Sequence, residues 1–336
     1  MRNQMTQKAW LIGILLVLAI LGTLLLSLNL GVIRISPMDV FRTLTGNGNE
    51  QNTMVLFQFR LPRMVIALLI GAGMAVSGAL LQGVTRNELA DPGIIGINAG
   101  AGFAVVLTIF LSQGNTADAG VLSIFLLPLA ALIGAVIAAV LIYAISWKNG
   151  VSPIRLVLVG IGINSAFAAL IVVFQLKMDP DDFTRATVWL SGNISGTDWT
   201  YVLALLPWIL IFIPLGLYKG TSLNTLFLGD DVAQGLGTKV EHERRTLLFI
   251  AVALAGASVS VGGGIAFLGL VVPHLSKKLV GPTFERLLPI TALMGAFLLL
   301  AADTIGRNIL APSEIPVGLI VSLIGGGYFI YLLMKS

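Results

Sequence analysis

Long apolar runs recur along nearly the whole of this 336-residue chain, and they restrict its fold more than any other feature. About ten runs have the length of ~20 residues that a helix needs to cross the hydrocarbon core of a bilayer. They cover residues 10–30, 64–84, 93–112, 121–146, 155–176, 199–218, 246–262, 265–280, 286–304 and 315–334. The sequence therefore predicts an all-α, polytopic membrane protein with about ten transmembrane helices, folded as a single transmembrane domain over residues 1–336.

Composition supports a chain with many spans rather than a soluble domain with one anchor. Hydrophobic residues make up 57% of the sequence and charged residues 11%, against roughly a quarter charged in soluble domains. The net charge of +4 is spread over loops, without the clustered basic stripe of a nucleic-acid binder. We therefore expect membrane lipid, and no nucleic acid, as a partner.

The first and eighth runs need separate interpretation. Trp10–Leu30 follows Arg2 and Lys8, as the apolar region of a secretory signal would, but such a region is only about 7–15 residues long. We interpret it as an uncleaved first span. In the run 265–280, Pro273 and neighbouring charges interrupt the apolar pattern, which predicts a short or broken helix.

The positions of basic residues predict the orientation. With N- and C-termini in the cytoplasm, the clusters Lys239–Arg245 and Lys277–Arg286 face inward, as the positive-inside rule favours. Two connecting segments are then long enough to form short surface helices, the outer Val32–Arg63 and the inner loop at about 219–245. Either segment could dock a partner.

Two Gly-rich segments, Gly71–Gly78 and Gly256–Gly263, resemble each other weakly and lie five spans apart. An odd offset would relate the two halves of the chain by an inverted repeat, which is common among transporters. Chance similarity between helices rich in small residues is an equally good explanation.

The sequence contains few features of an enzyme. No Gly-x-x-x-x-Gly-Lys-Ser/Thr loop is present to hold a nucleotide, and there is no cysteine for thiolate chemistry. His242 and His274 are the only histidines, in no zinc-binding spacing, and no Gly-x-Ser-x-Gly elbow occurs. We therefore expect a transport subunit with no catalytic residue, no metal site and no cofactor of its own.

Few ionisable residues lie within the expected spans, although ion-coupled carriers usually need them there. Asp303 and Arg307, one turn apart at an outer helix end, are as readily explained by a local ion pair. This pattern favours energy supplied by another subunit. The alternative is a secondary transporter or channel that is not powered by an ATPase.

Segments along most of the chain resemble one known family. They are Arg60-Leu-Pro-Arg63, Ser77-Gly-Ala-Leu-Leu-Gln82, Asn87-Glu-Leu-Ala-Asp-Pro-Gly93, Phe267-Leu-Gly-Leu-Val-Val-Pro-His274, and Ala302-Asp-Thr with Glu314-Ile-Pro-Val-Gly318. The chain is similar to iron-siderophore and cobalamin ABC importer permeases, most of all to the ferric hydroxamate (ferrichrome) permeases.

The resemblance implies a type II ABC importer permease in a bacterial cytoplasmic membrane, importing an iron-siderophore chelate. It also implies a second permease subunit, either a paralogue or an identical copy, and an extracytoplasmic substrate-binding protein. Two ATP-binding cassettes would use ATP for the assembly.

By this resemblance, Arg60, Arg63 and Arg307 would present exposed positive charge to glutamates of the binding protein, a contact weakened by salt. Helix-end snorkelling is the alternative.

The inner segment 228–237 has acidic residues at the start of a potential surface helix and Gly237 at its end. The resemblance assigns ATPase coupling to part of this segment, and an ordinary solvated connector is the alternative. The coupling residues would be Asp231, Ala233, Gly235, Leu236 and Gly237.

Along the fifth span, at the interface of two permeases, the resemblance implies a translocation path. Asn164, Ser165 and Gln175 are polar residues there that could contact substrate or hydrogen-bond neighbouring helices.

The cytoplasmic gate of relatives matches two short segments. They contain Asn87 and Leu89, and Ser152, Pro153 and Ile154. Glu88 stands where the family usually has proline, and Pro153-Ile154 replaces small hydroxyl residues.

Overall fold

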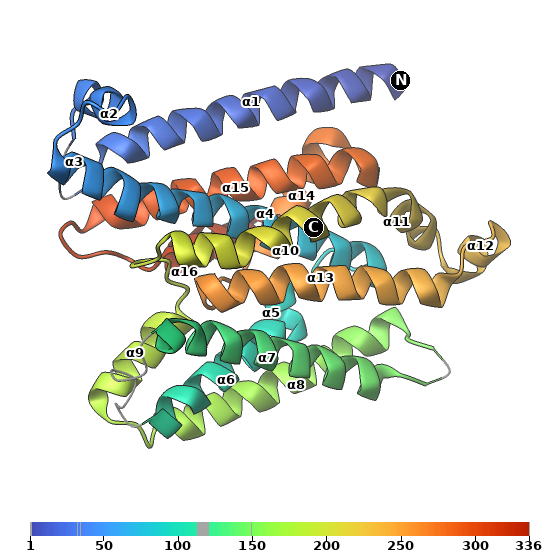
Figure 1. Ribbon diagram of the computed structural model, residues 1–336. Helices are drawn as coiled ribbons and strands as arrows, with labels where there is room; N and C mark the ends of the chain where they lie inside the picture. The colour runs from blue at the N-terminus through green and yellow to red at the C-terminus, as the bar shows by residue number, and fades with distance from the viewer. Residues whose placement is uncertain (1, 32, 34, 113–120, 149, 336) are drawn as a thin grey trace.

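The computed structural model describes residues 2–31, 33, 35–112, 121–148 and 150–335, which form one helical bundle (Figure 1). Val32 and Arg34, in the expected outer segment, lie outside the described residues. Within the described ranges there are no β-strands. The predicted all-α fold class is therefore confirmed.

Ten helices correspond to the ten expected spans. They are α1 (Arg2–Asn29), α4 (Leu61–Thr85), α6 (Ile97–Ser112), α7 (Val121–Ser146), α8 (Pro153–Gln175), α10 (Trp199–Tyr218), α13 (Val240–Gly262), α14 (Leu268–Val280), α15 (Phe284–Ile309) and α16 (Val317–Lys335). Among the described residues, 7 helices are long and apolar enough to cross a membrane. The helices α6, α14 and α16 are shorter or less apolar.

Short elements occupy the connections. They are α2 (Pro37–Leu44), α3 (Glu50–Met54), the π-helix η1 (Val55–Arg60), α5 (Pro92–Ile95), α9 (Pro180–Leu190), α11 (Gly220–Phe227) and α12 (Asp230–Gly235). Figure 1 places α11, α12 and the N-terminus at one end of the bundle, here called the α12 end. The elements α2, α3 and α9 lie at the opposite end, here called the α9 end.

Two expected spans have different boundaries in the structure. The run 93–112 is broken at Gly96, which has a φ of +104° that glycine adopts readily. This conformation ends α5 at Ile95, and α6 begins at Ile97. The helix in the run 265–280 is short, as predicted, but Pro273 lies inside α14 and does not end it. Its length is limited by the non-helical segment 263–267 that precedes it.

The centre of the bundle is α4, which packs against α13, α14 and α15. Small residues allow this close approach, since a methyl group added at Gly71 would overlap the carbonyl of Gly295, and one at Gly78 would overlap Gly269.

The packing of the two halves agrees with an inverted repeat. Helix α4 contacts α14 and α15. Helix α13 contacts α6 and α7 in the same way, and it runs in the direction opposite to α4 in Figure 1. The pairs α7–α8 and α15–α16 also correspond. The relation fails at the first helix of each half, because α1 packs mainly on α15 whereas α10 packs on α13 and α4.

We predict that Gly71→Ala lowers the free energy of unfolding by about 1–3 kcal/mol, because the added methyl group forces α4 away from α15. Gly22→Ala is the matched control, since a Cβ at Gly22 meets nothing within 4 Å. Thermal unfolding of both variants in the same detergent checks this. Equal melting temperatures would contradict the close contact.

Candidate functional site

The segment that joins α11 to α13 projects from the α12 end (Figure 1). As predicted, residues 230–235 form a short helix, and Gly237 follows it with a φ of +82°. Ala233 is buried, whereas Leu236 is 65% exposed, and Leu228 and Val232 are also exposed. We call Leu228, Val232 and Leu236 the α12 apolar patch.

Asp230 fixes this projection to the bundle. Its carboxylate accepts hydrogen bonds from Nη2 of Arg244 at 2.8 and 2.9 Å and pairs with Arg86, which follows the last turn of α4. Arg244 is buried, and its Nη1 donates to the carbonyl oxygen of Val151 at 2.8 Å. One carboxylate and two guanidinium groups thus connect α12, α4 and α13 with the residue just before Ser152.

The two predicted gate segments therefore lie directly beside this network, with Asn87 next to Arg86 and Ser152 next to Val151. Asn87 accepts a hydrogen bond from the backbone N–H of Leu89 at 2.9 Å, which closes a tight turn. The side chains of Leu89 and Ile154 are exposed at 48% and 73%.

Ser152 and Pro153 have a second role that the structure describes. Ser152 is the N-cap residue of α8 and Pro153 is its first helical residue, a position where the missing N–H of proline has no cost. The gate function of these residues stays a prediction.

Glu88 connects the first predicted gate segment to α14. Its carboxylate pairs with Lys277 and lies 3.4 Å from Nδ1 of His274. The hydrogen bond from Lys277 is the main cause that holds the pKa of Glu88 below its usual value. A proline at this position would lack the contact.

A cavity of about 310 Å³ opens beside α8 and brings together three polar residues. Asn164, one of the predicted path residues, lines it with Asp91 and Asn98. Asp91 is buried and accepts a hydrogen bond from the N–H of Gly93 at 2.7 Å, and Asn98 donates to the carbonyl of Ile265 at 3.0 Å.

Ser165 and Gln175 do not join this group. The hydroxyl of Ser165 donates to the carbonyl of Ile161 at 3.0 Å, and Gln175 donates to Thr187 at 3.4 Å. Sequence reasoning did not single out Asp91 and Asn98, which line the same cavity as Asn164. Asp91 belongs to the recognised segment 87–93, but the pattern did not indicate that it faces the same cavity as Asn164.

At the α9 end, the three predicted docking arginines are buried, not exposed. Arg63 donates from Nε and Nη2 to Asp303 at 2.9 and 2.7 Å, and from Nη1 to Glu314 at 2.7 Å. Arg307 pairs with Asp303 at 3.9 Å. The expectation of exposed charge is therefore wrong, because these guanidinium groups find their acceptors inside the protein.

Arg60 is held in the same way, since its guanidinium donates to the carbonyl oxygens of Leu28 and Ile33. Even so, Arg60, Arg63 and Arg307 all line one cavity of about 450 Å³, together with Glu314. Burial alone would raise the pKa of Glu314, but hydrogen bonds from Ser195 and Arg63 hold it below its usual value. Docking of a partner here stays a prediction, and it would require the partner to reach this cavity.

Comparison with known proteins gives consistent matches over the full chain. A family model described as the FecCD transport family matches residues 15–335. The iron(3+)-hydroxamate import system permease protein FhuG of Bacillus subtilis (strain 168) is 53% identical over 98% of this chain and 98% of its own length. The iron-uptake system permease protein FeuC of the same organism is 43% identical over 92% and 93%.

A solved structure shares the fold. It is described as an inward-facing conformation of a metal-chelate type ABC transporter, with a TM-score of 0.83 and 31% identity. The match covers 97% of this chain and 99% of that one.

We predict that Arg63→Ala destabilises the protein by about 3–5 kcal/mol, because it leaves the buried carboxylate of Asp303 without its main partner. Arg42→Ala is the control, since the Arg42 side chain is 62% exposed and its ion pair is on the surface. Thermal unfolding in detergent measures both variants. Wild-type stability of Arg63→Ala would show that the buried cluster does not hold the α9 end together.

Proposed function

Because the chain belongs to the FecCD transport family, we propose that it is the membrane-spanning permease of an ABC importer that carries a ferric hydroxamate chelate into the cytoplasm. The observation that supports this best is the match of the family model over residues 15–335. The hydroxamate class rests on the relative that is 53% identical, whose name gives iron(3+)-hydroxamate import. Energy comes from ATP hydrolysed on separate cassette subunits.

The α12 end is the cytoplasmic end in this proposal, and both termini lie in the cytoplasm. The basic clusters Lys239–Arg245 and Lys277–Arg286 support this orientation by the positive-inside rule. The cassettes then contact the α12 apolar patch, because exposed apolar side chains at the cytoplasmic surface favour a protein partner.

The network around Asp230 explains how such a contact could open the path. Movement of α12 acts on Arg244 and Arg86, and through them on the two segments that begin at Asn87 and Ser152. Since both segments are tied to one carboxylate, they respond to the cassettes together. The chain needs no ionisable group within its spans to be driven in this way.

A second permease subunit packs along α8, and the substrate passes between the two. Only 11% of the most apolar window of α8 is buried within the chain, so most of the helix is available to a partner. Asn164 of this helix shares one cavity with Asp91 and Asn98. The second subunit is a paralogue or an identical copy, and an extracytoplasmic binding protein delivers the chelate at the α9 end.

Uptake into proteoliposomes tests the proposal. The complete assembly with cassettes and binding protein should import an iron-labelled hydroxamate chelate only when ATP is inside, at a higher rate than a catecholate chelate. Vesicles that contain this chain without cassettes are the control. ATP-independent uptake by this chain alone, responsive to membrane potential, would replace the proposal with a secondary transporter or channel.

We predict that Leu236→Asp reduces cassette binding at least tenfold, because it places a charge in the α12 apolar patch. The side chain is 65% exposed, so the fold should be retained. Leu310→Asp, at a residue that is 59% exposed at the α9 end, is the matched control. Pull-down of the purified cassette measures both. Equal binding by the two variants would place the cassette elsewhere.

We predict that Arg244→Lys lowers the amount of chelate imported per ATP by about three- to tenfold while cassette binding persists. A lysine can still pair with Asp230, but it lacks the planar fork that also reaches Val151. Parallel uptake and ATPase assays on the full assembly measure this ratio. An unchanged ratio would mean that the contact with Val151 does not transmit movement.

A further inference from the structure

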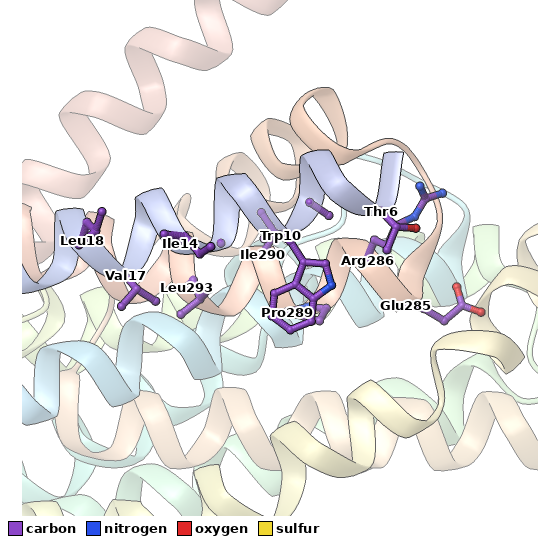
Figure 2. Close-up of a pocket in the computed structure, with 12 residues that line it drawn as sticks. Thr6, Trp10, Ile14, Val17, Leu18, Glu285, Arg286, Pro289, Ile290 and Leu293 are labelled. Carbon is purple, nitrogen blue, oxygen red and sulfur yellow. The ribbon is translucent and has the colours of Figure 1, made fainter. Parts of the chain in front are cut away.

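An apolar groove of about 560 Å³ runs between α1 and α15 (Figure 2). Along α1 it begins near Thr6 and ends near Leu18, and Gly13 is one of the residues that line it. Its lining is almost entirely apolar, and its charged residues, Glu285 and Arg286, both lie at the α12 end.

The dimensions of the groove fit one leaflet of a bilayer. From Thr6 to Leu18 an α-helix rises about 18 Å, close to half of a hydrocarbon core of about 30 Å. Helix α1 is peripheral, since only 17% of its most apolar window is buried. A partner transmembrane helix crosses both leaflets, so only about half of that helix could lie in the groove. One lipid acyl chain, in contrast, spans a single leaflet and fits the whole length of the groove.

The α12 end of the groove carries one charge of each sign, on Glu285 and Arg286. The Nη2 atom of Arg286 donates to Thr283 at 2.9 Å, while its Nη1 atom is buried and has no hydrogen-bond partner among the described residues. The carboxylate of Glu285 keeps its negative charge but is directed to α11, where it accepts from Asn224 at 2.6 Å and from Thr221 at 3.2 Å.

Trp10 is 73% exposed and lies in Figure 2 between the guanidinium and the apolar floor. Tryptophan favours this depth, where hydrocarbon gives way to head groups. From the α12 end, the groove therefore presents charged residues, then the Trp10 ring, then apolar side chains. This is the order of the head group, the interfacial region and the acyl chain of a lipid.

We infer that the groove binds one anionic phospholipid of the leaflet at the α12 end. An acyl chain lies along Gly13 between α1 and α15, and the phosphate accepts a hydrogen bond from the guanidinium of Arg286. The lipid joins α1 to the bundle, since α1 otherwise packs mainly on α15.

Native mass spectrometry of the assembled transporter tests this site. The complex is equilibrated with equal amounts of phosphatidylglycerol and phosphatidylcholine, and the lipids retained per permease are counted. We expect phosphatidylglycerol to be retained over phosphatidylcholine by about fivefold, as one basic residue near an anionic surface provides. Arg286→Gln should reduce this ratio to near one.

A second pair of variants separates the groove from general lipid binding. Gly13→Leu fills the groove and should remove one retained lipid per chain, because a Cβ at Gly13 already lies 3.6 Å from Ile290. Gly22→Leu lies on the same helix in open space and should retain it.

Three outcomes would overturn the inference. They are an equal ratio in wild type and Arg286→Gln, retention of the lipid by Gly13→Leu, and loss of a protein partner instead of a lipid in that variant. If Gly13→Leu does not assemble, the ratio measured for Arg286→Gln decides alone.

Discussion

The close packing of α4 determines the arrangement of the rest of the bundle. In a bilayer, helices gain little from burying apolar surface against one another, so association depends on close van der Waals contact between small residues. Gly71 and Gly78 let α4 approach α15 and α14 so closely that a methyl group at either position would overlap backbone atoms. Arg63 lies in the first turn of α4 and Arg86 follows its last turn. The buried contacts of Arg63 and the network around Asp230 are therefore held at opposite ends of one helix.

Much of the fold could be predicted because the bilayer imposes a length on each helix. The apolar runs 155–176 and 199–218 fall close to the observed bounds of α8 and α10, whereas α1 begins at Arg2, before its apolar run at Trp10. The break at Gly96 could not be predicted from hydropathy, since Ile95 and Ile97 are apolar and only the backbone conformation ends the helix. Pro273 was misleading for a related reason, because a membrane bundle accommodates proline within a helix when neighbouring groups satisfy the freed carbonyl.

The site was predicted less completely, because its key contacts join residues far apart in the chain. The segment 228–237 was identified as a surface helix from local pattern alone. Arg63, in contrast, finds its carboxylate 240 residues away in Asp303, so nothing near Arg63 in the sequence indicates its burial. The connections from Asp230 to Arg86, and through Arg244 to Val151, are equally non-local, and they give the two predicted gate segments a common support that the separate motifs did not suggest.

The short length of α14 has a consequence for where water can enter. A helix of 13 residues rises about 20 Å, less than the hydrocarbon thickness of about 30 Å, so the non-helical segment before it lies at the depth of lipid tails. Polar backbone there must be enclosed by protein or face an aqueous space. On one side the N–H of Gly264 bonds to the carbonyl of Trp189, and on the other Gly264 and Phe267 border the cavity of Asn164. Water can therefore reach this non-helical segment from the cavity of Asn164, where peptide groups not bonded within a helix are available to a solute.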